Sequence, residues 1–526
     1  MHQYWEHSIA QVTGSCLRVV TSAYRPLGGL YYFVLYRVFG FNPLPFRAVA
    51  LALMLANVYL ALVLLRRLSG SLLAALVGAV LMVNHPITLE LLYSSGTIYD
   101  ILCFLFYLLA VLCYFSWRDA AQRAGSATLS WPRIAAIVAL TGAALDAKET
   151  AMMLPAVLWL IEVVYFPPPK WTGRECLRFL WRQGRGAAIA AALVVPTIAI
   201  KVLTPNPLSN DPRYAAHTFL GTLKAYRGYQ NFLLYGNLGQ GELTFLRVLA
   251  LWIAMYLAAV LLRSRAMQFG LGFLLVSMLP VCLIQPRNGY MIYIPLFGWA
   301  LYCGAFFERS CDWLARRTRL RPRAQAVATL TAAVLLLAPL IKLHAETVWR
   351  RAAWIRIEHR DMDRFVALLR TQHPQLPPGS SLLLIDDPLP ASYYLLFMAQ
   401  LSYADPTLQL DRIKMMTNSP AGDELTGYDY LLAGRWQLHD VRGIRDPRPP
   451  VEVRLDGSAV VIPEFAGQTV DLVIRITAPP HRVVVRGVRL DSSGCAQLAE
   501  PVPPDSPARI AWVRPAGGDW MSAQPQ

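Results

Sequence analysis

The chain has 526 residues, of which 55% are hydrophobic and only 16% are charged, and its mean hydropathy is +0.38. This composition excludes a soluble globular protein of this size and predicts a protein that lives in a lipid bilayer. The formal net charge is +16. The basic residues do not form the patch interleaved with aromatic side chains that nucleic acid requires, so we expect no nucleic-acid partner.

Apolar stretches long enough, or nearly long enough, to cross a bilayer recur along the first two thirds of the chain. The sequence therefore predicts a polytopic α-helical membrane protein with about ten transmembrane helices. They are expected at 47–66, 71–84, 98–117, 132–145, 150–166, 186–203, 244–262, 268–286, 290–308 and 325–343.

Lys and Arg gather in every second connection between these stretches, with six arginines between residues 309 and 323 alone. Positive charge stays on the cytoplasmic side, so these connections are predicted to face inward and the alternate ones outward. The preference for Arg over Lys and the absence of eukaryotic sorting signals favour a multi-pass protein of a bacterial inner membrane.

Composition divides the chain into three regions. Residues 1–45 are expected to form the remnant of a first outer loop with amphipathic helices, and 46–343 the transmembrane domain. Residues 344–526 alternate Pro-rich breaks with short β-type runs such as "SLLLID", "VEVRLDG", "VDLVIRITA" and "RVVVRGVRL". This pattern predicts an α+β or mostly β soluble domain outside the cytoplasm.

Three of the outward connections carry polar residues at membrane depth. They are "NHPITLELLYSSGTIYD", "DAKET" and "QPRNGYMIYIP", and their side chains of interest are His85, Glu90, Asp100, Lys148, Glu149, Arg287, Tyr290 and Tyr293. Charges at this depth are costly and tend to face a cavity, a partner or a substrate. Their common side predicts one polar cavity that opens outward.

Each of these residues also has a purely structural interpretation. Lys148 and Glu149 can cap a helix and neutralise one another, and Arg287 can reach the lipid headgroups. His85 with Pro86 can simply end a helix, and the carboxylates of Glu90 and Asp100 can cap one. The sequence leaves both interpretations open. It contains no P-loop or other soluble-enzyme motif, which argues against an ATP-driven pump.

Together with "YRPLGGLYYFVLYRVFGFNPLPF" and "RNGYMIYIPLFGWALY", these segments resemble the ordered motifs of the GT-C glycosyltransferases, over roughly residues 20 to 310. The chain looks most like the protein O-mannosyltransferase-like and lipid A sugar-transferase-like branches. The resemblance implies a helical body with an active site just outside the membrane. It also implies transfer of a sugar from a polyprenyl-phosphate donor to a lipid, glycan or protein acceptor.

Carried onto this sequence, the resemblance assigns expected roles. Arg287 matches the arginine that holds the donor phosphate, and Lys148 is a second phosphate-binding candidate. Glu90 and Asp100 are expected on the acceptor side or at a divalent metal, Mg or Mn. The supporting positions are Tyr24, Arg25, His85, Glu149, Tyr290 and Tyr293.

One departure concerns the catalytic base. Relatives normally carry an acidic residue or pair after a first span, and this chain begins inside that loop, where Glu6 is the only acid before Glu90. Three explanations follow: a true start upstream that supplies the span and the acids, a base role for Glu6, or an inactive relative. We favour the upstream start, because an eleventh span gives an inward N-terminus.

The function expected from the sequence is a glycosyltransferase that uses a polyprenyl-phosphate sugar outside the cytoplasm. The first alternative is a noncatalytic scaffold or inactive relative, whose binding part is the C-terminal domain. The second is a transporter or flippase of a lipid-linked substrate, which predicts two related halves with paired half-helices. The sequence shows no such internal symmetry.

Overall fold

The structure is a computed structural model of the whole chain. It describes residues 10, 11, 13, 14, 25–40, 42–126, 128–168, 172, 175, 179–203, 218–234, 244–283, 289–318, 321–390, 394–405, 407–416, 425, 427–434, 436–440, 451–456, 458–477, 480–498, 508–516 and 521–525. The chain folds into two compact units, Gln3–Arg350 and Arg351–Gln526.

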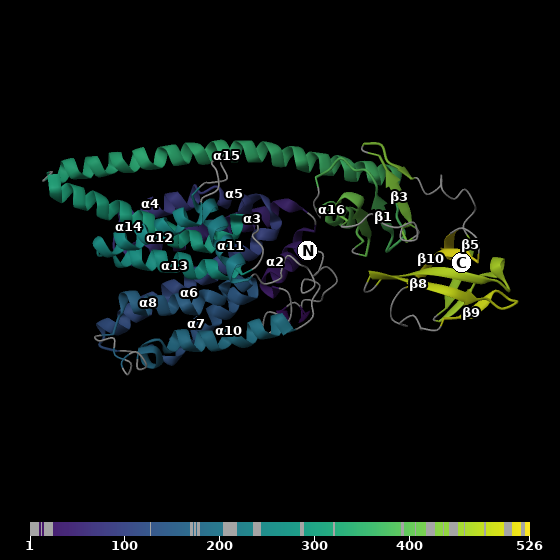
Figure 1. The fold of residues 1–526 in the computed structure, drawn as a ribbon, viewed down its shortest axis with the longest axis horizontal. Helices are drawn as coiled ribbons and strands as arrows, with labels where there is room; N and C mark the ends of the chain where they lie inside the picture. Colours follow the sequence, from purple (N-terminus) through teal and green to yellow (C-terminus); the bar gives the residue numbers. More distant parts are fainter. Residues whose placement is uncertain are drawn as a thin grey trace. The chain divides into compact units, whose positions relative to one another are not determined.

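The first unit is a helical bundle (Figure 1). Its main helices are α2 (Pro26–Phe39), α3 (Pro43–Ser69), α4 (Leu72–Val83), α5 (Ile87–Tyr93), α6 (Ile98–Arg123), α7 (Trp131–Ala147), α8 (Leu154–Tyr165), α10 (Arg185–Leu203), α11 (Phe219–Leu233), α12 (Phe245–Leu261), α13 (Arg265–Cys282), α14 (Tyr293–Thr318) and the first part of α15 (Pro322–Gln372), whose residues from Arg351 on belong to the second unit. Each of the ten apolar stretches expected from the sequence overlaps one of these helices.

The number of membrane crossings is a separate question. Among the described residues, five helices are long and apolar enough to cross a bilayer by themselves: α3, α6, α13, α14 together with the turn before it, and α15. The pair α4 and α5, bent by 58° at the break that holds His85 and Pro86, makes a sixth candidate. The chain is thus a multi-pass membrane protein. The expected number of ten crossings remains a prediction from the sequence.

Local sequence sets the helix boundaries. The Asn42 side chain accepts a hydrogen bond from the Leu44 amide at the start of α3, and Gly70 ends that helix in the left-handed conformation. Ser71 then caps α4 by accepting from the Ala74 amide. Such caps satisfy backbone groups that a helix end leaves unpaired, so a two-residue connection can join two apolar helices.

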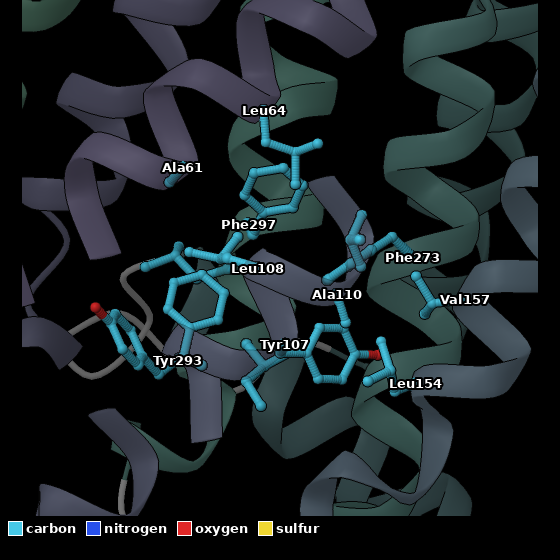
Figure 2. Packing of buried hydrophobic residues seen from close by; sticks show 14 of the residues in the cluster. Ala61, Leu64, Tyr107, Leu108, Ala110, Leu154, Val157, Phe273, Tyr293 and Phe297 are labelled. Carbon is cyan, nitrogen blue, oxygen red and sulfur yellow. The ribbon is translucent and has the colours of Figure 1, made fainter. Parts of the chain in front are cut away.

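The core of the bundle is apolar and tightly packed. α6 packs on α3 and α7, and α14 packs on α4 and α13. Figure 2 shows large buried side chains close together, among them Tyr107 of α6, Phe273 of α13 and Phe297 of α14. Between α13 and α14, Gly270 and Gly298 allow the two backbones to approach closely, as is typical of helices packed in a membrane.

The second unit holds two small sheets. In the first, β1 (Ser381–Leu384) pairs in parallel with β2 (Gln409–Arg412) and β3 (Tyr430–Ala433), and β4 (His439–Asp440) pairs antiparallel with β3. Met362, Phe365 and Leu369 from the end of α15 share a core with β1.

The other sheet has seven strands in the order β8-β7-β10-β11-β5-β6-β9. Their bounds are β5 (Val451–Asp456), β6 (Ala459–Val461), β7 (Thr469–Thr477), β8 (Pro480–Arg489), β9 (Cys495–Gln497), β10 (Ala508–Pro515) and β11 (Met521–Pro525). The four β-type runs picked from the sequence fall on β1, β5, β7 and β8, so the predicted α+β or β-rich character of the C-terminal region is confirmed.

Candidate functional site

The site begins where α7 ends. Ala147 is the last residue of α7, and Lys148 takes an extended conformation with φ −163° and ψ 144° before the short 3-10 helix η3 (Glu149–Met153). The Lys148 amide still donates to the Ala144 carbonyl at 2.9 Å. The single extended residue breaks the helix, and the side chains of Lys148 and Glu149 contact different helices as a result.

Lys148 pairs with Asp100 in the first turn of α6. Its Nζ lies 2.6 Å from Asp100 Oδ1, and both side chains are almost completely buried, with 4% and 8% of their surface exposed. The ammonium also lies 3.4 Å from Met291 Sδ and 5.4 Å from the centroid of the Tyr290 ring. Each buried charge therefore has its counter-charge at hydrogen-bonding distance, which offsets the cost of removing both from water.

Glu149 pairs with Arg25, just before α2. Arg25 Nη2 and Nε lie 2.9 Å and 3.0 Å from Glu149 Oε2. Arg25 has φ 48° and ψ 62°, a left-handed conformation that is rare for arginine and comes directly before Pro26. Such strain persists only where the surrounding structure holds it, and functional sites are the usual place.

Aromatic rings complete this cluster. The Arg25 guanidinium lies 5.2 Å from the centroid of Tyr99, whose ring also packs edge-on against Tyr32. The ring lies against Gly28 of α2, where any larger residue would collide with it. The guanidinium is thereby held between a carboxylate and a ring face.

The structure therefore brings five of the expected residues into one cluster, which we call the paired-charge cluster: Arg25, Asp100, Lys148, Glu149 and Tyr290. The idea that Lys148 and Glu149 neutralise one another does not describe the contacts, since Lys148 pairs with Asp100 on α6 and Glu149 pairs with Arg25 just before α2. The sequence singled out neither Tyr99 nor Met291. The one feature of the sequence that could have indicated Tyr99 is its position directly before Asp100 in "IYD".

Three further expected residues, His85, Glu90 and Tyr293, are described by the structure. His85 is buried in the turn between α4 and α5, with Nε2 3.1 Å from the carbonyl of Leu233 at the end of α11. Tyr293 is buried at the start of α14 (Figure 2), and its ring centroid is 4.6 Å from that of Phe104. Glu90 lies on α5, which packs against η7 (Gly289–Ile292). Glu6, Tyr24 and Arg287 are outside the described residues.

The cluster has a buried part and a partly exposed part. Asp100 and Lys148 form the buried part. Arg25 and Glu149 form the other part, and their side chains are 15% and 33% exposed. A guanidinium can hold a phosphate through two oxygens.

Within the described part of the chain, no group of three His, Cys, Asp or Glu side chains is placed to hold a metal ion, and Asp100 already faces an ammonium group. The predicted Mg or Mn site therefore gains no support from these residues.

Comparison with known proteins gives similarity at the level of three-dimensional structure alone. No family model matches the chain, and no curated protein matches it in sequence. It is similar to a crystal structure of ArnT from Cupriavidus metallidurans bound to undecaprenyl phosphate, with 16% identity, 73% of this chain and 75% of that chain covered, and a TM-score of 0.43. The apo structure of the same protein gives 14% identity, coverage of 78% and 82%, and a TM-score of 0.42.

Proposed function

We propose that the chain is a membrane glycosyltransferase that moves a sugar from a polyprenyl-phosphate donor to an acceptor outside the cytoplasm. The observation that supports this proposal most directly is the paired-charge cluster. The four ionic side chains of Arg25, Asp100, Lys148 and Glu149 form two neighbouring ion pairs at one end of an apolar bundle. They come from three of the segments that resemble the GT-C motifs. Charges are costly at such a place, and they are retained there chiefly for function.

In the proposed reaction, an acceptor oxygen or nitrogen attacks the anomeric carbon of the donor sugar. The bond between that carbon and the phosphate oxygen breaks, and the polyprenyl phosphate leaves with the electron pair. A single displacement of this kind inverts the anomeric configuration. A carboxylate takes the acceptor proton, and a base role for Glu6 is one of the three explanations that the sequence leaves open.

Arginine stabilises the charge that develops on the leaving phosphate. The resemblance implies this role for Arg287, and the geometry of the cluster supports Arg25 as a second participant. Arg25 is the more exposed cation of the two ion pairs, and Glu149 holds its guanidinium in place. Lys148 is the poorer phosphate ligand, because its ammonium is buried against Asp100. We therefore assign Lys148 and Asp100 to positioning the start of η3, where Glu149 lies.

The test measures release of free polyprenyl phosphate from a panel of polyprenyl-phosphate sugars by membranes that contain the native protein. Arg25→Gln and Arg287→Gln are each expected to lower kcat/KM by about 10² or more, as loss of an oxyanion-stabilising group does. Arg123→Gln is the matched control. Arg123 forms an exposed pair with Asp119, and it lies 23 residues after Asp100 on α6, about 35 Å away.

Two results contradict the proposal. Equal turnover by the native protein and both variants excludes the phosphate role of these arginines. No turnover by a folded native protein with any donor of the panel favours the noncatalytic scaffold, in which the two ion pairs only hold the bundle together.

A further inference from the structure

A hollow rich in arginine lies at the far end of α14 from the paired-charge cluster. Its volume is about 470 Å³, and its lining residues are Leu261, Leu262, Arg263, Arg309, Trp313, Arg316 and Arg317. α14 begins at Tyr293, next to η7, and Arg309 follows 16 residues later, about 24 Å along the helix. The hollow is therefore separate from the candidate catalytic end. The distribution of Lys and Arg predicts that it faces the cytoplasm.

Four arginines line the hollow, namely Arg263, Arg309, Arg316 and Arg317. None of them forms an ion pair with another described residue. Arg316 donates from Nε to the backbone carbonyl of Asp312 at 3.2 Å, and the Arg317 guanidinium lies 5.3 Å from the centroid of Trp313. Glu308 and Asp312 are on the same helix but do not line the hollow. Four like charges around this volume repel one another, and an anion with several acceptor oxygens relieves the repulsion.

Arg263 occupies a backbone position that favours glycine. It has φ 47° and closes the tight turn between α12 and α13. Its amide donates to the Val260 carbonyl at 3.0 Å, and the Ser264 amide donates to the Ala259 carbonyl at 3.1 Å. Helices commonly end in this way with glycine at the left-handed residue. The chain places an arginine there despite the strain, and this residue lines the hollow.

The surroundings of the hollow are apolar. Leu261 is 79% exposed and Trp313 52% exposed, and α12 continues this surface with the exposed side chains of Leu257 and Ile253. Tryptophan favours the boundary between headgroups and acyl chains. Basic pockets between helices on the cytoplasmic side of membrane proteins bind anionic lipid headgroups. A soluble anion accounts for the arginines but leaves this apolar border unexplained.

We propose that the hollow binds the phosphate of an anionic phospholipid from the inner leaflet. The four guanidinium groups surround the phosphodiester, and the acyl chains lie against the exposed apolar side of α12. The bound lipid neutralises the facing ends of α12 and α14. This proposal does not depend on the glycosyltransferase function, because the two sites lie at opposite ends of α14.

The test is native mass spectrometry of the full chain in detergent, titrated with phosphatidylglycerol, phosphatidylcholine or inorganic phosphate. Tighter binding of phosphatidylglycerol than of phosphatidylcholine is expected. Arg309→Gln combined with Arg317→Gln is expected to weaken phosphatidylglycerol binding about thirty-fold. Arg66→Gln combined with Arg67→Gln is the control, because it removes two exposed arginines from the same predicted side of the membrane.

The variant Arg263→Gly tests whether a loss of lipid binding can occur without a loss of stability. Glycine fits the left-handed turn, so the melting temperature is expected to stay the same or rise, while phosphatidylglycerol binding weakens about five-fold. Equal weakening by the Arg66 and Arg67 control overturns the proposal in favour of diffuse charge attraction. Binding of inorganic phosphate as tightly as phosphatidylglycerol, or unchanged lipid binding in Arg263→Gly and the double variant, overturns it as well.

Discussion

The Lys148 ammonium donates a hydrogen bond of 2.6 Å to the Asp100 carboxylate, and the two residues come from motifs 48 positions apart. The pair joins the end of α7 to the start of α6 inside a nearly water-free environment. It turns two costly charges into one neutral unit directly before Glu149 in the chain. We expect the partly exposed pair of Glu149 with Arg25 to depend on this buried ion pair.

Removal of one member of this pair is expected to be far more damaging than removal of both. Lys148→Met leaves the Asp100 carboxylate buried without a counter-charge, and we expect it to cost about 3–5 kcal/mol of unfolding free energy. The combined Lys148→Met and Asp100→Leu variant is expected to recover much of this loss. Unfolding of the detergent-purified protein measures both. Additive losses in the double variant contradict the coupling.

The second ion pair is expected to affect function more than stability. Arg25 and Glu149 are partly exposed, so Glu149→Gln is expected to cost no more than about 1 kcal/mol of stability. If Arg25 contacts the donor phosphate, the same change raises KM for the donor, because the guanidinium loses the carboxylate that orients it. Donor titration in membranes measures KM, and Asp119→Asn in the exposed pair is the control. A large loss of stability with an unchanged KM argues for a purely structural pair.

A side chain at Gly298, where α14 packs closely against α13, is expected to destabilise the protein. A Cβ on Gly298 would lie 2.6 Å from the Gly270 carbonyl oxygen and 2.7 Å from the Leu274 amide nitrogen, so backbone would have to move. We expect Gly298→Ala to cost about 1–3 kcal/mol. Gly142→Ala on α7 is the control, because its Cβ would meet only Leu193 at an ordinary 3.8 Å. Thermal melting of the two variants should differ clearly.

The C-terminal seven-stranded sheet is expected to weaken at acidic pH through Asp471. Burial acts to raise the pKa of Asp471, but hydrogen bonds from Arg514 and the Gly487 amide outweigh burial and hold this pKa below its usual value. The carboxylate therefore stabilises the sheet above the ordinary aspartate pKa of about 3.9, and this contribution is lost as the pH falls below that value. The effect is expected to stay below about 1 kcal/mol, because the pair is partly solvated.

Hydrogen exchange of peptides from β7 and β10, corrected for the intrinsic effect of pH, measures this acid weakening. Asp471→Asn is expected to remove the pH-dependent part of the protection. Glu464→Gln, at an exposed position of the same region, is expected to leave it intact. An unchanged acid response in Asp471→Asn assigns the effect to other groups.

The sequence alone predicted the helical body well. Long apolar stretches must bury their backbone groups in helices when the solvent is lipid, so composition and length locate α3, α6 or α13 without any tertiary information. The same stretches do not fix the number of crossings. Bends such as the one between α4 and α5 arise from packing and from residues at the break, and apolar length does not reveal them.

Five of the residues that the sequence singled out lie in one cluster, but the sequence did not predict which of them pair. The cost of charge at membrane depth is enough to single out Asp100, Lys148 and Glu149 in the amino-acid sequence. Only the tertiary structure decided that Lys148 pairs with Asp100 and Glu149 with Arg25. The reason is geometric: one extended residue at the end of α7 separates two neighbouring side chains, and the packing of α2 and α6 decides which counter-charge each of them meets.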